Sequence, residues 1–294
     1  MLTIRVPSRL SAQRMYGFLN EVIDEDMEPR DDTIGLDFSR LSFSDAAGVT
    51  MISNLIEWLR KRGVTVDFSN CDPDDQAISY LDDTGFFETY WGAKLSPFAR
   101  VRCTTYPFKR LHCSDSHQWI DGNVFPWIAN QIGVSVKALA EFKTCVRELF
   151  NNIHDHSTEE IGCMHVQKYP VANRLKIAVS DFGVGIPNEV RKVKDARTDA
   201  HALVIATTEG FTSKPGGKNM GAGLSYLIDN VVGRNCGLLS IYSGEGEIEF
   251  HPETGRIAKR VSISDGYYPG TLVSMTLRTD MLPEEGDDAG DLEW

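Results

Sequence analysis

Glu148 and Asn152 stand four residues apart in a segment with helical periodicity. Residues at this spacing share one face of a helix, so a carboxylate and an amide could act together on one substrate. Mg²⁺ takes oxygen ligands, usually few from the protein, with phosphate and water completing the set. The pair therefore fits a site that holds Mg²⁺ and orients a water molecule, although an exposed helix face without function would show the same pattern.

A second group of residues follows an apolar, strand-like segment at 175–179 and consists of Asp181, Gly183 and Gly185. A carboxylate buried at the end of a strand needs a hydrogen-bond donor, which the N6 amine of adenine would supply. The glycines would let the backbone approach a flat base or adopt a positive φ. The third glycine of the Rossmann pattern is absent, and an ordinary strand-to-loop turn uses the same residue types.

A third group is the glycine-rich segment 214–224, which leads into an apolar helical stretch. Glycines before a helix expose backbone N–H groups at its positive end, where a polyphosphate can bind. Such a segment also makes a natural mobile lid. It is not a P-loop, because the G-x-x-x-x-G-K-[ST] pattern is absent, and a plain flexible loop is the alternative.

In content and order, these three segments resemble the N, G1 and G2 boxes of the GHKL family of ATP-binding domains, which includes histidine kinases, DNA gyrase, MutL and anti-sigma kinases. The string F-T-S-K at 211–214 resembles an element of the ATP lids of this family. Gly270-Thr271 stands where the family often has a threonine near the base-binding aspartate. The resemblance covers about residues 135–278 and implies ATP and Mg²⁺ as ligands.

The resemblance implies a role for each matching residue. Glu148 would be the general base, and Asn152 would be the Mg²⁺ ligand. Asp181 would bind the adenine amine, with Thr271 behind it through a water molecule. The other implied nucleotide contacts are Gly183, Gly185, Lys214, Gly221, Gly223 and Leu224.

Histidines and cysteines offer other interpretations. His156 stands where GHKL relatives often carry a basic or aromatic residue, which implies packing or a phosphate contact, whereas His154 is expected to be structural. These two histidines as a zinc pair are a third interpretation. A further set with metal-binding residue types has a spacing that fits no common zinc finger. It comprises Cys103, His112, Cys113 and His117.

The presence of Glu148 bears on the type of reaction. A carboxylate that removes a proton suits ATP hydrolysis or transfer to a Ser or Thr hydroxyl. Many sensor kinases need no such base, because their phosphoacceptor histidine is itself nucleophilic. No helical hairpin with such a histidine precedes the second half of the chain. We therefore expect an ATPase or a protein Ser/Thr kinase, and not a sensor histidine kinase.

Strand-like and helical segments alternate through residues 1–95, which predicts a small parallel or mixed sheet with helices against it. The segments are 3–8, 10–27, 33–39, 47–62, 64–69 and 73–83. Residues 34–48, 64–69 and 82–87, with the helical segment 47–62, resemble the STAS domain of anti-sigma-factor antagonists, and the resemblance covers about residues 4–90. In antagonists the motif D-S-[ST]-G carries a phosphorylated serine, but Asp45-Ala-Ala-Gly48 has no hydroxyl there, and Ser44 is displaced. The resemblance therefore implies a docking module for a protein or ligand, without a phosphoswitch.

The second half begins with helical segments at 124–132 and 135–156. Strand-like runs follow at 163–169, 174–181, 238–244, 247–251 and 271–278, with helical stretches at 188–208 and 222–232 between them. This order predicts an α+β sandwich. The expected organisation is α/β with two domains: a STAS-like βα domain at 1–95, a connector at 96–122, a GHKL α+β sandwich at 123–282, and a disordered acidic tail at 283–294.

Composition limits the classes of partner. The 294 residues include 41% hydrophobic and 24% charged residues, with a net charge of −12. An acidic chain disfavours nucleic acids and anionic membrane surfaces. We find no apolar run long enough to span a membrane and no signal peptide, so we expect a cytoplasmic protein. The six scattered cysteines are expected to be reduced thiols.

The leading hypothesis is a signalling protein that binds ATP and Mg²⁺ and hydrolyses ATP slowly, which gates docking of the STAS-like module to a protein partner. One alternative is an anti-sigma-type Ser/Thr kinase acting on a separate partner. Another is a non-enzymatic, ATP-dependent binding module. A homodimer is compatible with all three hypotheses.

Overall fold

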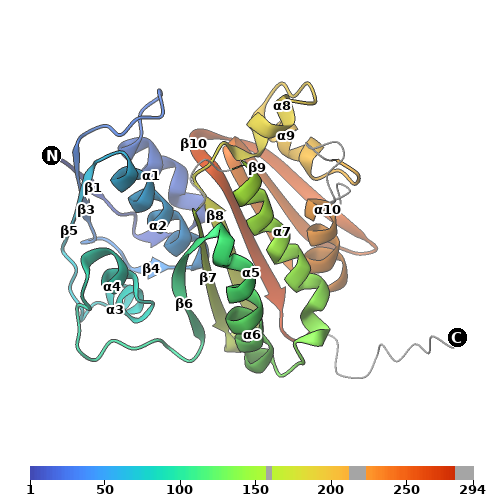
Figure 1. Ribbon diagram of the computed structural model, residues 1–294, viewed down its shortest axis with the longest axis horizontal. Helices are drawn as coiled ribbons and strands as arrows, with labels where there is room; N and C mark the ends of the chain where they lie inside the picture. The colour runs from blue at the N-terminus through green and yellow to red at the C-terminus, as the bar shows by residue number, and fades with distance from the viewer. Residues whose placement is uncertain (157–160, 212–222, 282–294) are drawn as a thin grey trace, which may run out of the picture.

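The computed structural model describes residues 1–156, 161–211 and 223–281, and it leaves out side chains at 111–114, 154–156 and 161. The chain forms an N-terminal unit with a parallel sheet and a second unit with a five-stranded antiparallel sheet (Figure 1). Among the described residues, no helix combines the length and apolar character needed to cross a membrane.

The N-terminal unit contains two groups of strands. The larger is a three-stranded parallel sheet in the order β1-β3-β5, so the predicted small sheet is wholly parallel. A two-residue parallel pair, β2 with β4, lies beside it. The strands are β1 (Leu2–Arg5), β2 (Arg9–Leu10), β3 (Thr33–Asp37), β4 (Phe43–Ser44) and β5 (Thr65–Ser69). The helices are α1 (Met15–Val22), α2 (Ala46–Lys61), α3 (Gln76–Asp83) and α4 (Phe86–Trp91).

Helix α2 is the central helix of this unit, and local chemistry fixes where it begins. The Asp45 carboxylate caps it by accepting a hydrogen bond from Gly48 N–H at 3.0 Å. A side chain at position 48 would collide with the carbonyl oxygen of Leu10, so the helix can reach β2 only with glycine there. The D-A-A-G string therefore has a structural role even without a hydroxyl.

The second unit is built on a sheet with strand order β6-β7-β8-β10-β9, in which all neighbours are antiparallel. The strands are β6 (Thr105–His112), β7 (Ile161–Tyr169), β8 (Arg174–Asp181), β9 (Leu238–Glu253) and β10 (Arg256–Arg278). The last two strands form a long hairpin, whereas the sequence predicted only separate short strands there. Irregular register between Ile263 and Leu272 breaks the alternation that would have revealed the full strand.

Helices cover one face of this sheet (Figure 1). They are α5 (Cys113–Trp119), α6 (Phe125–Ile132), α7 (Ala140–His156) and α10 (Gly223–Ile228), while α8 (Gly185–Arg191) and α9 (Asp199–Ala206) lie at one end. The single helical stretch predicted at 188–208 is in fact two helices. Thr198 begins the second one by accepting a hydrogen bond from His201 N–H at 3.1 Å.

The segment predicted as a connector, 96–122, contains β6 and α5. Strand β6 pairs with β7 and so extends the sheet of the second unit. The register shifts between Tyr106 and Lys109, where Pro107 lacks an N–H to donate. This irregularity removes the period of two by which a strand is recognised in a sequence.

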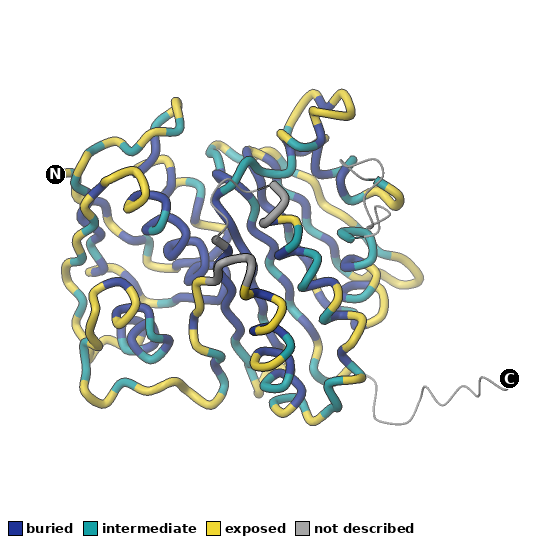
Figure 2. The backbone as a smooth tube through the Cα atoms, in the orientation of Figure 1, coloured by how far each residue is buried: buried dark blue, intermediate teal, exposed yellow. Residues whose placement is uncertain are grey.

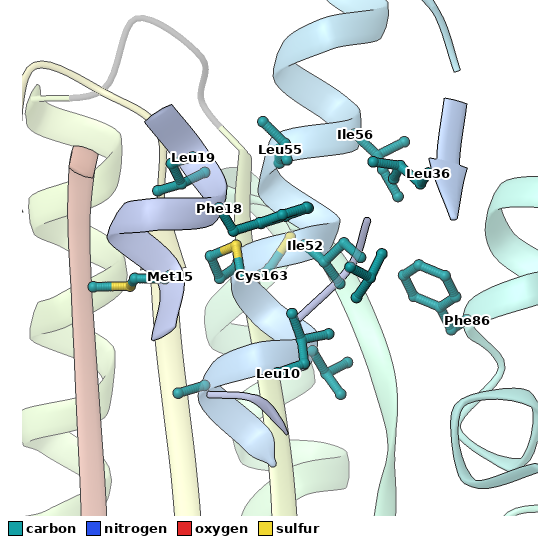
Figure 3. Packing of buried hydrophobic residues seen from close by; sticks show 14 of the residues in the cluster. Leu10, Met15, Phe18, Leu19, Leu36, Ile52, Leu55, Ile56, Phe86 and Cys163 are labelled. Carbon is teal, nitrogen blue, oxygen red and sulfur yellow. The ribbon is translucent and has the colours of Figure 1, made fainter. Parts of the chain in front are cut away.

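The N-terminal unit packs directly against the other face of the sheet. One apolar cluster contains Phe18 and Ile52 of the N-terminal unit together with Cys163 of β7 (Figure 3). Leu272 of β10 belongs to the same cluster. The backbone is buried on both sides of this contact (Figure 2). Consecutive side chains of a strand point to opposite faces, so each central strand of the sheet serves both clusters. The two units therefore share one continuous core.

Polar contacts join the units around this core. The Glu57 carboxylate of α2 pairs with the guanidinium of Arg110 on β6 at 2.8 Å. The hydroxyl of Tyr80 on α3 is hydrogen-bonded to the Nε2 atom of His165 on β7 at 2.9 Å. Burial lowers the pKa of His165 to about 3, so its ring is neutral in this contact.

We predict that the two units unfold together. Leu272→Ala should lower the free energy of unfolding by about 2–5 kcal/mol, because Leu272 is fully buried in the shared cluster. Val261→Ala on the same strand should cost less than about 1 kcal/mol, because Val261 is 39% exposed. Urea unfolding followed by circular dichroism and tryptophan fluorescence should give coincident single transitions; two separate transitions would contradict the shared core.

Candidate functional site

Asp181 is the last residue of β8, and its side chain is buried. Its Oδ1 atom accepts a hydrogen bond from Gly183 N–H at 2.6 Å. Burial raises the pKa of Asp181 to about 7, although this hydrogen bond acts in the opposite direction. The alternation along β8 assigns its face, since Ile177 and Val179 belong to the helix-covered core. Asp181 therefore faces the helix side of the sheet.

A carboxyl group in this state is suited to binding a donor. Removal from water penalises the charged form, so near neutral pH the group carries a proton in part of the molecules. A ligand that donates a hydrogen bond would favour the ionised form and recover part of that penalty. The arrangement can thus select an amine or amide donor on a flat ligand.

Thr271 lies directly opposite Asp181 in the β8–β10 register. Its Oγ1 atom is 3.2 Å from the Oγ atom of Ser243 on the next strand, β9. Ser243 Oγ also accepts a hydrogen bond from Ile186 N–H at 3.0 Å and donates to the carbonyl oxygen of Gly270. This network joins β9 and β10 to the start of α8 and so holds the backbone beside Asp181 in place.

Two glycines hold the turn that follows Asp181 close to β10. Gly185 has a φ of +75°, and a Cβ atom there would lie 2.8 Å from Ser243 Oγ. Gly270 has a φ of +96°, and a Cβ atom there would lie 2.5 Å from Gly183 N. Both positions therefore need glycine for conformation and for space.

Helix α7 positions Glu148 and Asn152. The Asn151 side chain donates a hydrogen bond from Nδ2 to Glu148 Oε1 at 3.0 Å. Asn151 Oδ1 lies 2.8 Å from His117 Nε2 of α5, which acts as the donor because Oδ1 is an acceptor. Glu148 is thus oriented by a chain of two side chains, whereas Asn152 is exposed.

Four of the predicted residues come together directly, namely Asp181, Gly183, Gly185 and Thr271. Helix α7 covers the same face of the sheet, and its C-terminal end lies at the same end as the β8–α8 junction (Figure 1). Glu148 and Asp181 have different hydrogen-bond partners, which are Asn151 for Glu148 and Gly183 for Asp181.

The glycine-rich segment is only partly described. Gly223 and Leu224 begin α10, which packs beside α7, and Leu224 contacts both the main core and the α8–α9 cluster. Lys214 and Gly221 lie outside the described residues, as do the side chains of His154 and His156. The assignment of these four residues stays a prediction.

The zinc and magnesium sites predicted from the sequence differ in the number of protein ligands that they need. Among the residues that the structure describes, no three His, Cys, Asp or Glu side chains group as a metal cluster. Cys103 is an exposed free thiol. The Mg²⁺ site expected at Asn152 would use a single protein ligand with phosphate and water, so it needs no cluster of protein ligands and stays a prediction.

Ser243, Asn151 and His117 were not connected with this site from the sequence, where His117 was considered only as a metal ligand. Asn151 is three residues after Glu148, a spacing that also brings side chains together on a helix, so the sequence held a signal for it. Ser243 and His117 had no such signal, because each reaches its partner through tertiary packing across 28 or more residues of sequence.

Alanine substitutions at two glycines test how much the close backbone packing around Gly270 limits the residue type at that position. Gly270→Ala should lower the free energy of unfolding by about 3 kcal/mol or more, because strain at positive φ adds to overlap with the Asp181–Gly183 backbone. Gly255→Ala is the matched control, with a φ of +74° and nothing within 4 Å of the added Cβ, and should cost about 1–2 kcal/mol. Urea denaturation measures both; equal losses would show that close packing at Gly270 is unimportant.

The chain was compared with known proteins by sequence and by structure. A search of curated proteins finds no significant match. Among solved structures, the chain is similar to the B-subunit of the DNA gyrase from Myxococcus xanthus, at 14% identity and a TM-score of 0.20. That alignment covers 38% of this chain and 29% of the gyrase chain. A family model for the STAS domain matches residues 1–97. The N-terminal unit is therefore a STAS domain, which confirms the prediction for this part of the chain.

Proposed function

We propose that the chain binds Mg²⁺–ATP at the end of the second sheet, in a domain of the GHKL type. Slow hydrolysis of the nucleotide would then control how the STAS domain meets a protein partner. The observation that carries this proposal is the buried Asp181 carboxyl, with Thr271 opposite it and a glycine-held turn beside it. A desolvated acceptor next to a backbone that permits close approach suits an aminopurine.

The adenine end of the site follows from this group. The N6 amine of adenine would donate a hydrogen bond to the Asp181 carboxylate. This bond would replace the hydrogen bonds from water that the carboxylate loses on burial. Gly183 carries no side chain, so a flat base could approach the backbone there, whereas the space beside Gly185 is taken up by Ser243 and the Gly270 carbonyl. Thr271 and Ser243 offer hydroxyls that could hold a bridging water molecule on the same face of the sheet.

The phosphate end would lie towards the end of α7. Glu148 would take a proton from the attacking water, and the contact with Asn151 keeps the carboxylate oriented for this task. Mg²⁺, when bound, would neutralise phosphate charge, with Asn152 as its ligand. The exposure of Asn152 is compatible with a ligand whose other partners are phosphate and water.

Coupling to the STAS domain would use the face of β8 opposite to the one on which Asp181 lies. Phe182 follows Asp181 and packs edge-on against Tyr268, with ring centroids 5.2 Å apart. Ser180, which precedes Asp181, is hydrogen-bonded to the Tyr268 hydroxyl. Both Phe182 and Tyr268 belong to the cluster shared with the STAS domain. A nucleotide that favours one arrangement of this turn would therefore favour one arrangement of the interface.

Matched variants test the proposal. Asp181→Asn should weaken Mg²⁺–ATP binding at least about a hundredfold, because the single amide oxygen would accept from Gly183 N–H and the NH₂ group would face the adenine amine. Glu148→Ala should bind ATP like the parent chain and release little phosphate. Asp26→Asn, in an exposed loop, is the control and should change neither. Calorimetric titration measures binding, and an assay for released phosphate measures turnover.

Three results would contradict parts of this proposal. Unchanged ATP binding by Asp181→Asn would remove the base-binding role, and normal turnover by Glu148→Ala would remove the assigned base. Label from γ-phosphate-labelled ATP on Ser or Thr of a partner would replace hydrolysis by the kinase alternative. Absence of any heat or stabilisation with Mg²⁺–ATP in the parent chain would reject nucleotide binding.

A further inference from the structure

A groove of about 310 Å³ lies where the STAS domain meets β8, apart from the Asp181 site. Most of its lining comes from β2, β4 and the residues between β2 and α1, and β8 contributes Lys176. The lining residues are Arg9, Ser11, Gln13, Arg14, Phe43, Asp45 and Lys176. Along β8, Lys176 points to the STAS-facing side, where it pairs with Asp45, whereas Asp181 points to the helix side.

The groove is basic although the chain is acidic. Three cations line it against one carboxylate, in a protein of net charge −12. The carboxylate, Asp45, is already engaged, because it caps α2 and pairs with Lys176 at 3.3 Å. Within the described part of the chain, neither Arg9 nor Arg14 forms a salt bridge. Two guanidinium groups are therefore left without a counter-charge in a concave site.

The geometry limits what the groove can bind. Arg9 is stacked over the Phe43 ring at 4.3 Å, which reduces the freedom that its side chain would lose on binding. Guanidinium groups match the oxygens of phosphate with two parallel hydrogen bonds. The volume is at the small end of the range for small-ligand pockets, about 300–1,000 Å³. A small dianion fits these features better than a nucleic acid, which an acidic chain repels.

We propose that this groove binds a phosphate monoester dianion through Arg9 and Arg14, with Lys176 as the third cation. The bound group would contact the STAS domain and β8 of the second unit at once, so its binding would stabilise their junction. This site is independent of the proposed ATP site, because it uses the other face of β8 and shares no residue with it.

Calorimetric titration of the full chain at low ionic strength tests the site. The probes are inorganic phosphate, glycerol phosphate and a peptide with one phosphoserine, and glycerol is the neutral control. Arg14→Gln should weaken binding about tenfold or more, because charge-assisted hydrogen bonds are lost. Arg256→Gln, in the distant β9–β10 hairpin, should leave binding unchanged. Asp45→Asn should tighten binding, because it removes the one carboxylate among the described lining residues and keeps a residue that can cap α2.

Each outcome decides the proposal. Binding of glycerol phosphate that depends on Arg14 supports it with a free ester as the source, and the same dependence for the phosphopeptide alone supports it with a modified polypeptide as the source. Asp181→Asn should not affect this binding, which separates the groove from the ATP site. No binding of any probe up to about 10 mM, or equal affinity of the parent chain and Arg14→Gln, would overturn the proposal.

Discussion

The alternation of side chains along β8, with both faces of the sheet buried, is the constraint on which the rest of the structure depends. Asp181 points to the helix-covered side, while its neighbours Ser180 and Phe182 point to the STAS domain. A shift of one residue in register would exchange these roles and bury the carboxyl in the domain interface. The Asp181 site and the interface with the STAS domain therefore use opposite faces of the same strand.

This arrangement gives the STAS domain a specific place. Its helices α1 and α2 cover a face of the sheet that would otherwise expose a large apolar surface to water. The STAS domain is thus packed onto the second unit through one continuous core, and is not tethered to it by a free linker. Phe182, the residue after Asp181, belongs to this core and packs against Tyr268.

Periodicity allowed much of the fold to be predicted. Helix α2, helix α7 and strand β8 each have a regular apolar pattern and were placed within a few residues of their observed bounds. The facing of Thr271 and Asp181 was also anticipated, although from resemblance and not from the residues themselves. The STAS domain was recognised from its motif strings, and the family match confirms it.

Other features could not be read from local patterns. Strand β6 was missed because Pro107 and a bulge interrupt its alternation. The packing of the STAS domain on the sheet depends on contacts between residues far apart in the chain, such as Tyr80 with His165. The basic groove between the units was missed for the same reason, since Arg14 and Lys176 have no relation in the sequence.

We propose that Asp181 is a desolvated hydrogen-bond acceptor whose negative charge is restored when a nucleotide binds. Carbon-13 NMR of aspartate-labelled chain, with Asp181 assigned by its loss in Asp181→Asn, measures its titration directly. We expect a pKa of about 7 in the free chain and a lower pKa with saturating Mg²⁺–ATP, because an amine donor favours the ionised form. An ordinary pKa of about 4 in the free chain, or a pKa that ATP does not change, would contradict the claim.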